Sequence, residues 1–130
     1  NFIIRTSPMD IDLKKMKNPS RKMAPMTNAQ VEEAARHFTI LSEPSRLVLL
    51  RSLMDGPLTV TELVANSGMK QGNVSKHLGV LLRARFVVKE KLGTFAQYSI
   101  SDPYIFPLCE LMCDRMQRDA QTRLQTLSDT

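Results

Sequence analysis

The sequence contains no segment that would span a membrane or direct the chain for export. Its apolar blocks are short, such as residues 47–50, whereas a membrane-spanning helix needs about 20 apolar residues. The N-terminal residues also lack the basic segment, apolar core and small-residue cleavage site of a signal peptide. We therefore expect a cytoplasmic protein that has no membrane partner.

Residue types that carry much of enzyme chemistry are scarce. The chain has two cysteines and two histidines, and no Cys–His pair stands at helical spacing. It has neither a glycine-rich phosphate loop nor a cluster of carboxylates. We predict that the protein is not an enzyme. Because the cytoplasm is reducing, we also expect Cys109 and Cys113 to be free thiols.

Positive charge is concentrated in two parts of this 130-residue chain, whose net charge is +5. Residues 1–26 carry six lysines and arginines against two aspartates. Residues 70–91 carry six more against Glu90 alone. This concentration suits a polyanionic partner, although a solvated basic face is a common alternative.

We divide the chain into three segments. Residues 1–26 contain three prolines and no steady periodicity, which predicts a basic, flexible arm. Because the sequence does not begin with Met, part of this arm could derive from processing or from an expression vector. Residues 27–124 have the regular patterns of one folded domain, and residues 125–130 are expected to be a C-terminal tail.

The segment over residues 59–82 has the pattern of two short helices joined by a tight turn. Thr59 and Glu62 form a capping box, and Gly68 can adopt the positive φ that ends a helix. In the second helix the apolar side consists of Val74, Leu78, Leu81 and Leu82. The opposite side carries groups that can hydrogen-bond base edges and phosphates, namely Gln71, Asn73, Ser75, Lys76 and His77. This pattern predicts a recognition helix for a DNA major groove, the alternative being a plain helical hairpin with a solvated face.

Two helices are expected before this segment. Thr27 and Gln30 form a capping box that begins the first, and Pro44 suits the first position of the second. The apolar stripe of the first helix is Val31, Ala34, Ala35, Phe38 and Leu41. The inward side of the second is Leu47, Leu49, Leu50 and Leu53.

A β-hairpin and a last helix are expected after the recognition helix. The β-type runs at residues 86–89 and 95–100 are separated by Gly93, which predicts a turn. A hairpin directly after a helix-turn-helix defines a winged helix, so the predicted fold is mostly α with a small β-hairpin wing. On the first strand, Lys89 and Lys91 are placed to meet backbone phosphates.

The last helix is expected from Tyr104 to about Leu124, with one apolar side. A small winged-helix core has little room for this side or for that of the first helix. We therefore predict a homodimer that pairs through the first and last helices. Its two recognition helices would lie about 34–36 Å apart and read an inverted repeat in double-stranded DNA.

Three motifs in this order resemble the ArsR/SmtB family of bacterial winged-helix repressors, over about residues 30–118. They are FTILSEPSRL at residues 38–47, QGNVSKHL at residues 71–78 and GTFAQYSI at residues 93–100. From the matching motifs we add Arg46 and Gly72 to the predicted DNA-contacting residues, together with Lys70. The resemblance implies a dimeric, sequence-specific transcriptional repressor that leaves its operator when a metal ion, a metalloid or a reactive sulfur species acts on it.

The sequence departs from the family pattern at three positions. Lys70 replaces the usual capping Ser, so the recognition helix has a weaker cap but an added charge for a phosphate. Arg85 replaces the usual glycine, which either places a bulky residue at a left-handed position or alters the turn. Thr94 stands where an arginine is frequent at the wing tip.

The metal sites implied by the resemblance are incomplete in this chain. Thr59 and Thr61 occupy the positions of the Cys-x-Cys pair of the arsenic and lead sites. Asp102 matches the site on the last helix, but Tyr104, Arg115 and Arg118 stand at or near its other ligand positions. The remaining histidine, His37, is expected on the surface of the first helix.

Cys109 and Cys113 remain as candidate sensing residues, spaced i,i+4 on the last helix. Their thiolates would suit a soft metal or a metalloid, and they could instead oxidise or form a sulfur bridge. The thioethers of Met112 and Met116 nearby would suit copper(I). The alternative is that both cysteines are small apolar residues of a dimer interface. The protein would then be a winged-helix regulator without an inducer site. A winged-helix module for protein interaction and dimerisation is a separate alternative for the whole chain.

Overall fold

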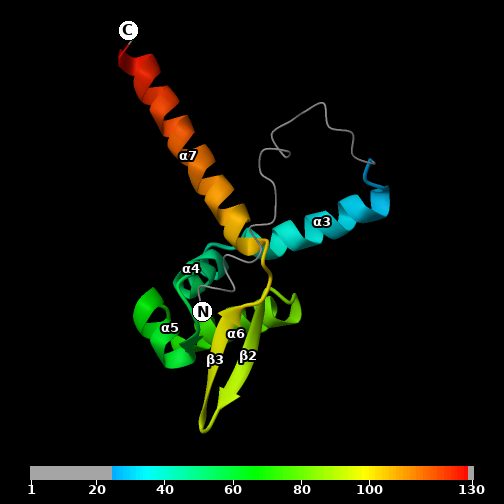
Figure 1. Cartoon of the computed structure of the whole chain (residues 1–130), viewed down its shortest axis with the longest axis vertical. Helices are drawn as coiled ribbons and strands as arrows, with labels where there is room; N and C mark the ends of the chain where they lie inside the picture. The colour runs from blue at the N-terminus through cyan, green and yellow to red at the C-terminus, as the bar shows by residue number, and fades with distance from the viewer. Residues whose placement is uncertain (1–24, 129–130) are drawn as a thin grey trace.

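The computed structural model of the chain describes residues 25–128. The predicted N-terminal arm therefore lies almost wholly outside the described residues. The elements in chain order are α3 (Asn28–Leu41), α4 (Pro44–Leu53), β1 (Leu58–Thr59), α5 (Val60–Ser67), α6 (Gln71–Arg83), β2 (Val87–Leu92), β3 (Phe95–Ile100) and α7 (Ile105–Ser128) (Figure 1).

Local hydrogen bonds fix where the helices begin, as the sequence predicts. The Thr59 hydroxyl accepts from the Glu62 amide at 3.1 Å, and the Glu62 carboxylate accepts from the Thr59 amide at 2.9 Å. The same reciprocal pair joins Thr27 and Gln30 at the start of α3. Gly68, at φ 74°, ends α5 in the left-handed region, and this turn sets the direction in which α6 leaves.

The sheet has the strand order β1-β3-β2, with both pairs antiparallel. β2 and β3 form the expected hairpin, which turns at Gly93 (φ 65°) and pairs Val87 with Ile100. β1 pairs its two residues with Gln97 and Tyr98 of β3. The sequence did not predict β1, because a two-residue strand is too short to show a period.

The core lies where α4, α5 and α6 meet under the base of the hairpin. Its buried side chains are Leu49, Leu50, Leu53, Leu63, Val74, Leu78, Leu81, Phe86, Val87, Ile100, Ile105 and Phe106. Leu47 and Leu82 were expected to face inward, and that prediction is wrong, because they are 44% and 36% exposed. In α6 the buried side is turned away from Leu82 and includes His77 instead.

His77 is a buried residue, so the prediction that it faces outward with the DNA-reading side chains is wrong. Its side chain is 8% exposed, and Nδ1 accepts a hydrogen bond from Arg46 Nε at 3.3 Å. Arg46 also donates from Nη1 to the carbonyl oxygen of Ile40 at 3.2 Å. The pair thereby joins the C-terminal end of α3 and the start of α4 to α6.

Helices α3 and α7 project from this core in different directions, and α7 points away from the hairpin (Figure 1). α3 has no buried residue, and every α7 residue after Leu111 is exposed. α7 ends at Ser128, four residues beyond the expected end at Leu124. None of the described helices is long and apolar enough to cross a membrane.

We predict that His77→Ala destabilises the protein by about 1–3 kcal/mol, because it leaves Arg46 Nε without its partner and opens a gap beside the core. The matched control is Lys76→Ala, one residue away on the exposed side, which we expect to change stability by about 0.5 kcal/mol or less. Urea unfolding at fixed protein concentration measures both. Equal midpoints for the two variants would contradict the structural role of His77.

Candidate nucleic-acid interface

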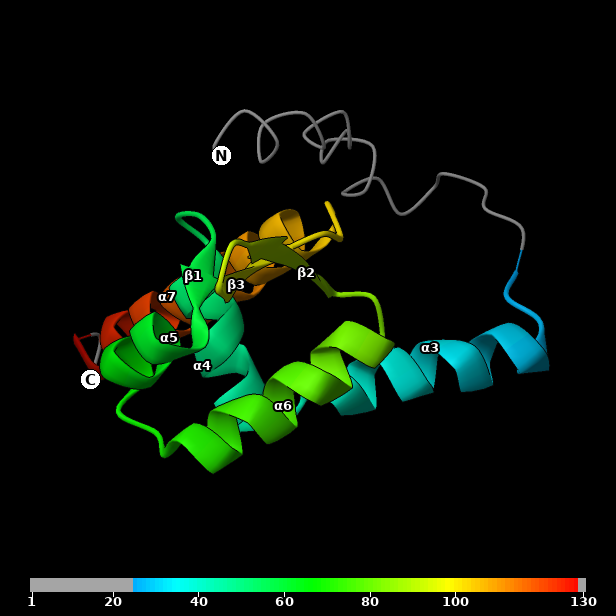
Figure 2. The ribbon, with the colours of Figure 1, turned by 90° about the horizontal axis from the view of Figure 1, so that it is seen from below.

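The polar side of α6 is exposed along its first two turns. Gln71, Gly72, Asn73, Ser75 and Lys76 are all exposed, while Val74, His77 and Leu78 are buried. None of their side chains takes part in a hydrogen bond or ion pair within residues 25–128. Seen from below, α6 lies at the surface of the molecule (Figure 2). These donors and acceptors are therefore available to an external partner.

The N-terminal end of α6 has the polarity that attracts a phosphate. Lys70 is exposed and occupies the N-cap of α6, where its side chain makes no hydrogen bond. This agrees with the weaker cap expected where lysine replaces serine. The first turn contains no acidic residue. Helix amides without partners carry partial positive charge, and Lys70 adds a full charge beside them.

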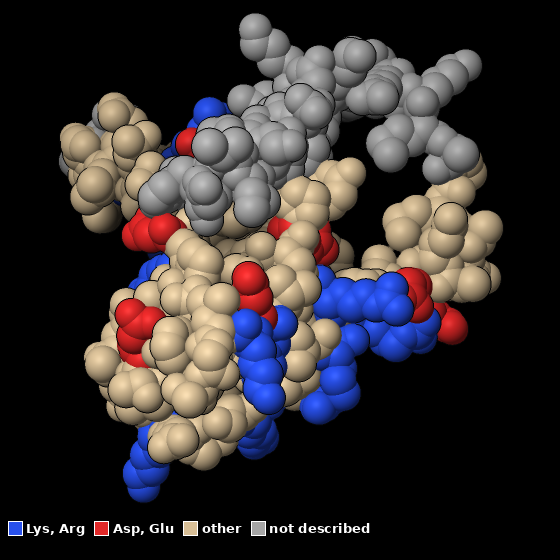
Figure 3. Space-filling view, turned by 60° about the horizontal axis from the view of Figure 1, so that its bottom comes forward, with Lys and Arg blue, Asp and Glu red and all other residues tan. Residues whose placement is uncertain are grey.

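The wing places its two lysines on one face of the hairpin. Lys89 and Lys91 alternate with Val88 and Glu90 along β2, and both lysines are exposed. Lys89 Nζ lies 5.8 Å from the centre of the Tyr98 ring, which stands opposite it on β3. Basic side chains gather over this end of the molecule in the space-filling view (Figure 3).

Of the ten predicted DNA-contacting residues, eight are exposed on α6, its N-cap or the wing. Arg46 is half-buried and His77 is buried, and both make hydrogen bonds inside the protein. The neighbouring Glu43 caps α4 by accepting from the Ser45 amide at 3.0 Å. That hydrogen bond lowers the pKa of Glu43, and the nearby Arg46 charge lowers it further.

Of the two outcomes expected at Arg85, a bulky residue in the left-handed conformation or an altered turn, the structure has the left-handed conformation. The φ of Arg85 is 67°, and it is the only residue other than glycine with a positive φ in the described part of the chain. Such a conformation costs an L-residue about 1–2 kcal/mol relative to the right-handed one. With Arg36 and Arg83, Arg85 lines a hollow between α3 and the start of β2. In the sequence, the only sign of this arginine group was that Arg85 replaces a glycine. Arg36 is distant in the sequence, so no local pattern connected it with Arg85.

The two cysteines lie one turn apart near the start of α7. Cys109 is half-buried against the core, and Cys113 is exposed. Burial raises the pKa of the Cys109 thiol, and Cys113 and Glu110 add to the effect. Among residues 25–128 no group of three or more His, Cys, Asp or Glu could hold a metal ion. One protomer therefore offers two thiols at this position.

We predict that Cys113 reacts with iodoacetamide faster than Cys109 at pH 7. Cys109 is less exposed and its raised pKa leaves less thiolate, which is the reactive form. The ratio of the Cys113 rate to the Cys109 rate should decrease as the pH rises through the range in which thiols ionise. Peptide mass spectrometry after timed alkylation measures both sites, and faster labelling of Cys109 at pH 7 would contradict the assignment.

Comparison with known proteins identifies the family. Residues 43–89 match the family described as bacterial regulatory protein, arsR family. The HTH-type transcriptional regulator NmtR of Mycobacterium tuberculosis is 35% identical over 91 residues, which cover 70% of this chain and 76% of that protein. A probable mercury resistance operon repressor of Streptomyces lividans is 35% identical over 80 residues, or 62% of this chain and 64% of that one.

The fold agrees with solved structures of such regulators. The crystal structure of the AntR antimony-specific transcriptional repressor matches with a TM-score of 0.71 at 32% identity. The match covers 81% of this chain and 96% of that one. These similarities confirm the winged helix-turn-helix fold and a role in DNA-binding transcription regulation rather than catalysis. The chain belongs to the arsR family of bacterial regulatory proteins.

Proposed function

We propose that this protein is a homodimeric, cytoplasmic transcriptional repressor that reads an inverted-repeat operator with α6. The observation that carries the proposal is the exposed polar side of α6, which has no partner within the described residues. Gln71 and Asn73 can each form two hydrogen bonds with an adenine edge, and Lys76 can donate to a guanine. Lys70 and the wing lysines supply phosphate contacts on either side, which set register without reading sequence.

The uncovered apolar side chains of α3 and α7 support the homodimer. Phe38 of α3 is 60% exposed, and Met112 and Met116 of α7 are 53% and 57% exposed. Fully burying one such side chain is worth about 1.5–3 kcal/mol, so covering several would favour association. A second copy offers the same two helices, and a twofold axis through them would present two α6 helices to one DNA face.

We place the inducer site at Cys109 and Cys113. In a dimer paired through α7, two such pairs would offer up to four sulfurs to a soft metal or a metalloid. Similarity to a probable mercury resistance operon repressor and to an antimony-specific repressor supports this class of ligand. Oxidation of the pair is the second chemistry open to it. Because Cys109 packs against the core, a ligand there would act where α7 leaves the DNA-binding domain.

We expect Asn73→Ala and Lys91→Ala to weaken DNA binding in different ways. Loss of a base contact at Asn73 should cost about 1–3 kcal/mol on the preferred duplex and little on random DNA. Loss of a phosphate contact at Lys91 should weaken binding to every duplex and reduce the slope of log K against log salt by about 0.9. Fluorescence anisotropy with a duplex selected from a random library measures both. A sequence-selective loss for Lys91→Ala would contradict the assignment.

The double variant Cys109→Ser, Cys113→Ser should bind DNA with unchanged affinity but no longer respond to inducer. Titration of the protein–DNA complex with antimonite, arsenite, mercuric ion and polysulfide tests this, with the wild type as reference. Met112→Leu and Met116→Leu are the matched controls on the same helix and should keep the response. Release of the double variant by the same compound that releases the wild type would remove the cysteines from the inducer site.

A further inference from the structure

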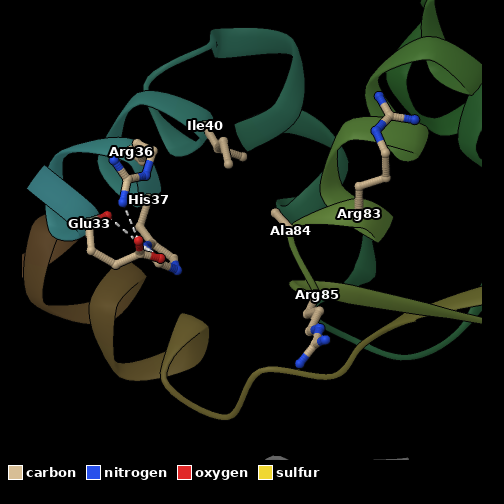
Figure 4. A pocket seen from close by; sticks show the side chains of 7 residues that line it. All are labelled: Glu33, Arg36, His37, Ile40, Arg83, Ala84 and Arg85. Carbon is tan, nitrogen blue, oxygen red and sulfur yellow. Dashed lines mark hydrogen bonds and ion pairs between the residues drawn. The ribbon is translucent and has the colours of Figure 1, made fainter.

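A hollow of about 380 Å³ lies between α3 and the corner that joins α6 to β2 (Figure 4). The polar residues that line it are three arginines, one glutamate and one histidine. The lining residues are Glu33, Arg36, His37, Ile40, Arg83, Ala84 and Arg85. None of these residues belongs to the predicted DNA-contacting set or to the cysteine pair.

Two of the three arginines have no partner in the described part of the chain. Arg36 pairs with Glu33 one turn away on α3. Arg83 and Arg85 make no side-chain hydrogen bond or ion pair within residues 25–128. The Arg83 guanidinium lies back along α6, where Nη1 is 3.4 Å from the position that a Cβ on Gly79 would occupy. Arg83 and Arg85 therefore carry positive charge that the described residues do not neutralise.

The left-handed backbone conformation of Arg85 suggests a binding role for its side chain. The turn itself is held by main-chain groups, since the Arg85 amide donates to Leu82 O at 3.1 Å and its carbonyl oxygen accepts from the Ser101 hydroxyl at 3.0 Å. Glycine would form both bonds without strain at φ 67°. A binding role for the guanidinium would explain why arginine occupies this strained position instead of glycine.

The arrangement of the guanidinium groups favours an extended polyanion over a small anion. In Figure 4, Arg83 points along α6 away from α3, Arg85 extends from the other side of Ala84, and Arg36 stays on α3. Donors that hold one small anion converge on a point, whereas these are spread along an edge. Seen from below, α6 and α3 adjoin at this edge (Figure 2).

We propose that Arg36, Arg83 and Arg85 form an arginine rim that binds phosphates of the DNA backbone beyond the C-terminal end of α6. The inference rests on the proposed function, because it assumes that α6 enters DNA. In a dimer paired through α3 and α7 the rim would lie between the two recognition helices. It would therefore contact the central part of the operator, independently of base sequence.

The test uses the double variant Arg83→Gln, Arg85→Gly of the full chain, in salt titrations of duplex binding. We expect the affinity for every duplex to fall at least tenfold near 0.15 M salt, and the slope of log K against log salt to drop by about 0.9 for each lost contact. Arg85→Gly alone should raise the melting temperature while it weakens DNA binding, because glycine removes the strain. Arg85→Lys should retain most of the binding.

The control is Arg118→Gln, which removes one positive charge from the exposed part of α7 and should leave the salt slope unchanged. If the double variant keeps the wild-type slope while Asn73→Ala loses affinity, the rim proposal is wrong and the proposed function stands. If the wild type binds no duplex at low salt, both are wrong. A third outcome is that inorganic phosphate raises the melting temperature of the wild type but not of the double variant, while the two proteins bind duplexes equally. The hollow would then be a small-anion site, and the rim proposal would be overturned.

Discussion

The packing of one side of α6 into the core determines which of its side chains remain available to a partner. Val74, Leu78 and Leu81 are buried at 0–1% exposure, and His77 joins them through its hydrogen bond with Arg46. Because an α-helix turns every 3.6 residues, burying this side leaves residues 71–73, 75 and 76 on the surface. The same packing therefore stabilises the domain and aligns the groups proposed to read DNA.

Features encoded by neighbouring residues could be predicted from the sequence, and features that depend on distant residues could not. The capping boxes, the turn at Gly68 and the hairpin each depend on residues a few positions apart. The burial of His77 depends on Arg46, which is 31 positions away in the chain. The periodicity of apolar residues predicted that His77 is exposed. Periodicity cannot locate the edge of a buried helix face to within one residue, which is why this prediction was wrong.

The departures from the family pattern explain more of this surface than the matches do. Lys70 leaves the start of α6 without a side-chain cap, so amides without a side-chain partner and a lysine charge lie together at this end of the helix. Arg85 keeps a strained conformation where glycine would be relaxed. Both substitutions give up local stability and add positive charge beside α6. A protein selected for stability alone would not be expected to do this at both ends of one helix.

The position of the cysteines on α7 connects the proposed inducer site with α6. Ile105 and Phe106 anchor the start of α7 in the same core that holds α6, and the exposed part of the helix continues to Ser128. Cys109 lies at the boundary between these two parts, and Cys113 lies one turn outside it. A ligand that bound both sulfurs in each protomer would fix how α7 leaves the core. Since the partner is proposed to pair along α7, a small rotation at this boundary would change the distance between the two recognition helices, and operator affinity depends on that distance.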